Sequence, residues 1–181
     1  MDGSQEDQQG EPVTRSGREP SGPYHLLFVC SGNTCRSPMA LGLARSALES
    51  WGWRTIEVRS AGVAAFSGTP ASQGALRASS RHGIDLTGYR STELTPDLVA
   101  WADWILTMSR GHLVAVERMG GAGKSSVITD LGADPHTHGG SWNEGVVDPI
   151  GGDDSVYEET FQQLRTLVER RLVDLVADKP E

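Results

Sequence analysis

The sequence predicts an α/β fold: a single domain arranged as a three-layer sandwich with a central four-stranded parallel sheet. Two observations lead to this prediction. Short apolar runs that favour strands alternate with segments that favour helices, which is typical of a parallel sheet covered by helices on both faces. The chain has 181 residues, a length that usually forms one domain and suffices to bury a core.

Each element is expected from a local pattern. Buried strands are predicted from short β-prone runs at 25–29, 55–58, 104–108 and 126–128. Helices are predicted to begin where a hydroxyl can cap the backbone, in three cases beside a proline, at Ser37-Pro38, Thr69-Pro70, Thr95-Pro96 and Ser109. The last helix is expected over residues 154–177, where apolar residues recur at helical spacing, and a long loop at 130–152 precedes it.

The first 23 residues differ in composition from the rest of the chain. They are rich in Gly, Pro, Ser, Gln and charge, with almost no large apolar side chain. Such a segment cannot offset the entropy lost on ordering, so residues 1–23 are expected to form a disordered tail. The folded domain is then expected to span residues 24–181.

Composition also narrows the class of function. The formal net charge is −8, whereas a nucleic-acid-binding protein normally carries a basic surface, so no nucleic-acid partner is expected. No apolar stretch approaches the roughly 20 residues that span a bilayer, and the N-terminus lacks the apolar core of a signal peptide. We therefore expect a soluble, cytoplasmic protein with no membrane partner. Its two cysteines fit a reducing compartment, since they cannot build a disulfide framework.

The segment between the first strand and the first helix carries the strongest chemical signal, Cys30-Ser31-Gly32-Asn33-Thr34-Cys35-Arg36-Ser37. Gly32 and Asn33 tolerate positive φ and let the loop curl, so that backbone N–H groups point inward and can bind an anion. The helix N-terminus adds positive potential, and Arg36 can bind two phosphate oxygens at once. The same field is expected to lower the pKa of Cys30 and favour a nucleophilic thiolate.

Residues 28–40 closely resemble the signature loop of the low-molecular-weight phosphotyrosine phosphatase family: Phe28-Val29-Cys30-Ser31-Gly32-Asn33-Thr34-Cys35-Arg36-Ser37-Pro38-Met39-Ala40. Three further segments resemble that family, namely Arg59-Ser60-Ala61-Gly62, Arg81-His82-Gly83-Ile84 and Asp148-Pro149, which is similar to its mobile acid loop. The resemblance extends from about His25 to the C-terminus. It implies a flavodoxin-like fold and a phosphatase that needs no metal and no other cofactor.

The resemblance also implies a role for each site residue. Cys30 is expected to attack phosphorylated protein substrates and form a phosphocysteine intermediate. Asp148 is expected to protonate the leaving group and then to activate water. The phosphoryl oxygens are expected to be held by the Arg36 side chain and by the backbone of Ser31, Gly32, Asn33, Thr34, Cys35 and Arg36. Asn33 and Ser37 are expected to brace the loop and the thiolate.

Two departures from the phosphotyrosine pattern bear on the substrate. Thr34 stands where many tyrosine-specific members have a bulky aliphatic residue, and Asp148-Pro149 is followed by Ile150-Gly151-Gly152 where those members have aromatic residues. Both features resemble the bacterial protein-arginine phosphatases of the same family. The Thr34 hydroxyl can face a guanidinium that an aliphatic side chain would leave unpaired, and Ile150 would be the apolar lining. We expect phosphoarginine as the substrate, with phosphotyrosine as the alternative.

Cys35 has two interpretations. It can form a reversible disulfide with Cys30 that protects the nucleophile from over-oxidation, which we favour, or it is a small buried apolar side chain. The spacing of Asp134, His136 and His138 in one loop is too weak a pattern to predict a metal site.

Two other classes of protein remain as distant alternatives. A thiol-coupled arsenate reductase shares the fold but passes oxidation to further cysteines, and this chain has none after Cys35. A non-catalytic phosphate-binding module would not require Cys30, Arg36 and Asp148 together.

Overall fold

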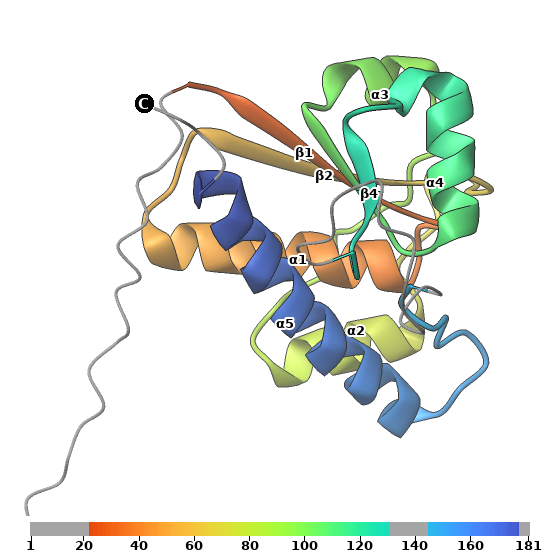
Figure 1. The fold of residues 1–181 in the computed structure, drawn as a ribbon. Coiled ribbons are helices and arrows are strands. Elements are labelled where there is room, and N and C mark those ends of the chain that lie inside the picture. Colours follow the sequence, from red (N-terminus) through yellow and green to blue (C-terminus); the bar gives the residue numbers. More distant parts are fainter. Residues whose placement is uncertain (1–21, 131–144, 178–181) are drawn as a thin grey trace, which may run out of the picture.

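The computed structural model describes residues 22–130 and 145–177 and confirms the predicted α/β fold (Figure 1). The expected disordered tail, residues 1–23, falls almost entirely outside the described residues. Four parallel strands form one sheet in the order β2-β1-β3-β4. Their bounds are Tyr24–Cys30 for β1, Ile56–Gly62 for β2, Trp104–Thr107 for β3 and Ser125–Val127 for β4.

Alternate residues of β1 face two different cores. Leu26 and Phe28 belong to one core, Leu27 and Val29 belong to the other, and all four are fully buried. The first core includes residues of α1 (Arg36–Trp51), α2 (Gln73–Arg81) and α5 (Asp154–Ala177). The second includes residues of α3 (Pro96–Trp101) and α4 (Arg110–Val116), so helices cover both faces of the sheet, as predicted (Figure 1).

Two of the four expected helix caps occur as predicted. The Thr95 hydroxyl accepts the backbone N–H of Leu98 at 3.3 Å at the start of α3. The Ser109 hydroxyl accepts the backbone N–H of His112 at 3.4 Å at the start of α4. A π-helical turn, η1 (Glu117–Gly121), continues from α4.

The caps expected at Thr69 and Ser37 are wrong. α2 begins after Ser72, whose hydroxyl accepts the backbone N–H of Ala75 at 3.3 Å. Thr69 instead donates its hydroxyl to a carbonyl of its own loop. α1 begins before Ser37 rather than after it, and the Ser37 hydroxyl bonds to side chains of the preceding loop.

Strand β2 extends beyond its predicted end at residue 58 and reaches Gly62, which pairs with Cys30. A Cβ at Gly62 would lie 2.4 Å from the Ser31 carbonyl oxygen, closer than atoms can approach. Only glycine therefore lets the end of β2 lie against the loop that follows Cys30. Within the described ranges, no helix is long and apolar enough to cross a bilayer.

Candidate active site

The loop that follows Cys30 lies at the carboxyl ends of the strands. β2 and β3 pair with opposite sides of β1, so Cys30 ends its strand at the switch point where open α/β sheets bind ligands. Asn33 has a φ of 55°, and among the described non-glycine residues it alone has positive φ. The expected curl of the loop thus depends on Asn33, since Gly32 does not adopt positive φ.

The Asn33 side chain fixes the direction of the hydrogen bonds beneath the loop. Its Oδ1 accepts the backbone N–H of Thr92 at 2.7 Å, which identifies the other terminal atom as the amide nitrogen. Nδ2 donates one proton to Ser37 Oγ at 2.7 Å and the other to Ser60 Oγ at 3.1 Å. Both serine oxygens therefore act as acceptors toward Asn33 and keep their own protons for other partners.

Ser37 contacts the nucleophile candidate. Its Oγ lies 2.9 Å from Cys30 Sγ, and because Oγ accepts from Asn33 and keeps its own proton, the Ser37 O–H can donate to the sulfur when Cys30 is a thiolate. On the other branch, Ser60 Oγ lies 2.9 Å from the Tyr89 hydroxyl. A continuous chain of hydrogen bonds thus links Tyr89 to Cys30.

The expectation of a lowered thiol pKa at Cys30 is wrong for this state of the protein. Burial raises the pKa of the Cys30 thiol above its ordinary value, although the Ser37 hydrogen bond and the Arg36 charge act in the opposite direction. Cys30 is 2% exposed, so a thiolate there loses most of its hydration. The Arg36 charge is also shared with Asp148, which leaves less of it to stabilise a thiolate.

Arg36 connects the loop to the segment that carries Asp148. Its Nη1 donates to the Val146 carbonyl at 3.0 Å, and its Nη2 donates to Ser31 Oγ at 3.2 Å and to Asp148 Oδ2 at 2.5 Å. Its Nε is buried and has no hydrogen-bond partner among the described residues. The side chain of Arg36 is 6% exposed and that of Asp148 is 35% exposed, so the ion pair lies at the mouth of the site.

The Asp148 segment is anchored to the end of β3. The backbone N–H of Val146 donates to the Met108 carbonyl at 2.8 Å. Gly145 has a φ of 84°, and a Cβ there would lie 2.0 Å from the same carbonyl oxygen, so this approach requires glycine. The Ile150 side chain is 69% exposed beyond Asp148, where it can line an incoming substrate without being part of the core.

Thr34 and Cys35 do not share the hydrogen-bond partner of Cys30. Thr34 is half-buried, and its Oγ1 lies 3.7 Å from Cys35 Sγ. The Cys35 thiol is buried and lies 3.2 Å from Ser72 Oγ and 3.5 Å from the Tyr157 hydroxyl. Both cysteines are free thiols, and Cys35 is held by α2 and α5 rather than by the groups that contact Cys30.

Sequence reasoning missed several residues that contact the predicted site or support it. Among them are Ser60, Tyr89, His112 and Val146. Ser60 lay within a segment that resembled the family, which was a usable signal. The other three are far in sequence from the loop, and nothing in their local patterns distinguishes them from ordinary packing residues.

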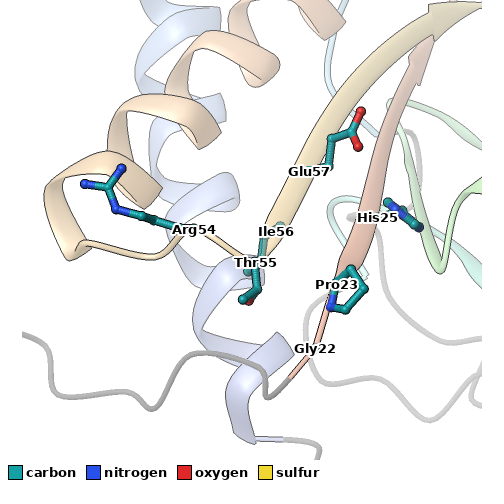
Figure 2. Close-up of a pocket in the computed structure, with 7 residues that line it drawn as sticks. All are labelled: Gly22, Pro23, His25, Arg54, Thr55, Ile56 and Glu57. Carbon is teal, nitrogen blue, oxygen red and sulfur yellow. The ribbon is translucent and has the colours of Figure 1, made fainter.

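Other candidate sites do not coincide with this loop. A hollow lined by residues 22, 23, 25 and 54–57 lies at the amino-terminal ends of β1 and β2, opposite to the end that carries Cys30 (Figure 2). In the part of the chain that the structure describes, no three His, Cys, Asp or Glu residues gather as a metal site requires. Asp134, His136 and His138 lie outside the described residues.

Comparison with known proteins places the chain in one family. The model of the low molecular weight phosphotyrosine protein phosphatase family matches residues 25–180. A protein-arginine-phosphatase of Geobacillus stearothermophilus is 39% identical over 149 residues, which make up 82% of this chain and 93% of that protein.

Solved structures agree with the sequence match. One is a YwlE arginine phosphatase in which cysteine is replaced by serine and the active-site serine is phosphorylated; it has a TM-score of 0.74 at 31% identity, covering 86% of this chain and 97% of that one. A low molecular weight protein tyrosine phosphatase from T. tengcongensis also has a TM-score of 0.74, at 32% identity, covering 83% and 99%. The chain therefore belongs to the low molecular weight phosphotyrosine protein phosphatase family.

Proposed function

We propose that the chain is a cysteine-dependent protein phosphatase that hydrolyses phosphoarginine in proteins. One observation carries the proposal: Cys30, Arg36 and Asp148 meet at one curled loop, with Arg36 bonded to Asp148 at 2.5 Å and Ser37 bonded to Cys30 at 2.9 Å. A nucleophile, a cation for the phosphoryl group and a carboxyl for proton transfer are the groups that a covalent phosphatase needs.

The proposed reaction has two steps. The reaction starts from the Cys30 thiolate, which attacks phosphorus while the bond from phosphorus to the leaving atom breaks, and the protonated Asp148 carboxyl gives that atom a proton. Water then attacks the phosphocysteine, with Asp148 taking the proton, so that the thiolate leaves and inorganic phosphate forms. Arg36 and the loop N–H groups stabilise the charge on the phosphoryl oxygens in both steps.

The rim of the site supports a guanidinium leaving group. We expect the Thr34 hydroxyl and the Asp148 carboxyl group to face the leaving group, and Ile150 is the exposed apolar side chain beyond Asp148. A planar guanidinium can donate to both oxygens, whereas a phenyl ring gains nothing from them. The relative named as a protein-arginine-phosphatase supports the same choice. The tyrosine phosphatase of similar fold keeps phosphotyrosine as the second candidate.

Matched peptides test the proposal. Two peptides of one sequence, with phosphoarginine or phosphotyrosine at the same position, are compared by kcat/KM, which reports discrimination between substrates. We expect at least a tenfold preference for phosphoarginine. Equal or reversed values would assign the tyrosine activity, and the absence of turnover with either peptide would reject the phosphatase itself.

We also propose that Cys30 and Cys35 form a reversible disulfide under peroxide. A peroxide oxidises the Cys30 sulfur to a sulfenic acid, which condenses with the Cys35 thiol and releases water. In the reduced protein the Cys35 thiol is bonded to Ser72 and lies near Tyr157. Mass spectrometry should find the linked species, removed by a thiol reductant; sulfonic acid at Cys30 without it would contradict the proposal.

We also propose the partners of the enzyme and its compartment. Phosphorylated proteins are the partners that this activity requires. We place the enzyme in the cytoplasm, where a reducing environment keeps the two free thiols reduced.

A further inference from the structure

His112 contacts the active-site loop from a distant part of the chain. It lies in the first turn of α4, is 6% exposed, and places Nε2 2.8 Å from Ser31 Oγ. On the other side of the ring, Nδ1 lies 2.9 Å from Ser109 Oγ, the cap of the same helix. Both ring nitrogens are therefore engaged, which fixes the plane of the imidazole.

Ser31 connects this imidazole to Arg36. Its Oγ accepts a proton from Arg36 Nη2 at 3.2 Å while it contacts His112 Nε2. A serine hydroxyl has one proton and two lone pairs, so it can serve both partners at once. Whichever nitrogen of His112 carries the proton, the contact holds the Ser31 oxygen in place and leaves a lone pair for Arg36.

The guanidinium of Arg36 is thereby fixed at two points. Val146 accepts one proton of Nη1 and Ser31 accepts one proton of Nη2. The buried Nε–H, the second Nη1 proton and the second Nη2 proton remain, and Asp148 accepts the last of these. The Nε–H and the Nη2 proton lie on the same side of the guanidinium. These two N–H groups form the fork that can hold two phosphoryl oxygens.

We propose that His112 is a positioning residue, which fixes the Ser31 hydroxyl and through it the plane of the Arg36 guanidinium. The inference rests on the proposed phosphatase function, because it assigns Arg36 to the phosphoryl group. His112 suits this role as a neutral group: burial and the Arg36 charge lower its pKa to about 4, although Asp148 acts in the opposite direction. At neutral pH it therefore adds no second charge beside Arg36.

The test compares His112→Gln with His112→Asn. A glutamine amide reaches about as far as Nε2 and can still hold Ser31, whereas the shorter asparagine reaches only toward Ser109. With an aryl phosphate as substrate, His112→Asn should lower kcat/KM and weaken inhibition by inorganic phosphate, each about tenfold, the value of one hydrogen bond. His112→Gln should stay within about threefold of the wild type. Equal losses in both variants would overturn the proposal.

A double-mutant cycle separates positioning from general stability. If His112 acts through Ser31, His112→Asn should change kcat/KM less than twofold in a Ser31→Ala background. Full additivity of the two losses would overturn the proposal. His82→Asn is the matched control, since His82 is a partly buried histidine bonded to Glu158 on α5, and it should leave phosphate inhibition unchanged.

A second pair of variants applies if His112→Asn does not fold. Ser31→Ala removes the hydroxyl that links His112 to Arg36, and Ser31→Thr keeps it. We expect about a tenfold loss of phosphate inhibition in the alanine variant and near wild-type inhibition in the threonine variant. Wild-type inhibition in Ser31→Ala would overturn the proposal. Failure of the wild type to turn over any phosphate ester would instead reject the phosphatase function.

Discussion

The two sides of the active-site loop differ in how their polar groups are satisfied. The floor is the set of side chains that hydrogen bonds connect to Cys30 beneath the loop, namely Ser37, Asn33, Ser60 and Tyr89. The rim is the set of half-buried or exposed side chains at the mouth, namely Thr34, Val147, Asp148 and Ile150.

Floor and rim are expected to have different roles, the floor in the chemical step and the rim in the choice of substrate. Floor groups bond to one another and not to the leaving group, so we expect them to treat every phosphoryl group alike. In the rim, Asp148 is paired with Arg36, while the Val147 and Ile150 side chains are exposed, so the rim is accessible to the leaving group. Variants of the floor should therefore change turnover of both substrates equally, and variants of the rim should change their ratio.

The largest effect is expected from Cys30→Ser, which replaces the side chain to which the hydrogen bonds of the floor lead. A serine hydroxyl is a far weaker nucleophile than a thiolate, so turnover of phosphoarginine and phosphotyrosine peptides should both fall by about 10⁴-fold or more. Phosphate affinity should persist, because its donors are Arg36 and the loop backbone. Calorimetry with inorganic phosphate checks the second point, and normal turnover by the variant would remove Cys30 as the nucleophile.

Asp148→Ala should give the next largest effect and should depend on the leaving group. Proton donation contributes about 10²–10⁴-fold where the leaving group is poor, and almost nothing where it departs as a stable anion. A series of aryl phosphates with graded leaving-group pKa measures this dependence in the variant and the wild type. A loss that is uniform across the series would show that Asp148 is not the general acid.

Thr34→Ile should alter the ratio of the two substrates. Isoleucine removes the hydroxyl that we propose faces the guanidinium, and leaving a polar group unpaired costs about 1–3 kcal/mol, or roughly 5- to 150-fold in kcat/KM. A phenyl ring suffers no such loss, so the phosphotyrosine peptide should be affected little. If turnover of both peptides changes equally, Thr34 does not select the substrate, and phosphotyrosine becomes the better assignment.

The smallest effect is expected from Tyr89→Phe at the far end of the floor. Without the Tyr89 hydroxyl, Ser60 can turn away from Asn33, so turnover of both peptides should fall about two- to fivefold. Tyr157→Phe is the matched control, since that hydroxyl contacts Cys35 instead of the chain that leads to Cys30. A change confined to one substrate in Tyr89→Phe would break the distinction between floor and rim.

Local patterns were sufficient to predict the order of elements. Each strand was visible as a short apolar run because both faces of a parallel sheet are buried. Caps were predicted less well: a hydroxyl beside a proline identified Thr95 correctly but failed at Thr69, where Ser72 takes the role. Which hydroxyl caps the helix depends on how the preceding loop packs against the rest of the protein. The sequence near the helix does not determine that packing.

The site, too, has a part that local sequence predicts and a part that it does not. The loop from Cys30 to Ser37 could be predicted because its residues are adjacent in sequence and each has a local reason to be there. Its supports could not, because Tyr89 and His112 reach it only through the sheet topology. The pKa of Cys30 was also misjudged, since a nearby cation was visible in the sequence and the depth of burial was not.

The anchor at Gly145 and Val146 determines where the chain tolerates insertions and deletions. Because Val146 is bonded to Met108 and also holds Arg36, the chain length from this point to Asp148 must let the carboxyl reach Arg36. One residue added between Val146 and Asp148 would displace the carboxyl by about 3.5 Å. Length changes before Gly145 leave that spacing intact, so relatives and engineered variants can differ there while keeping one reaction.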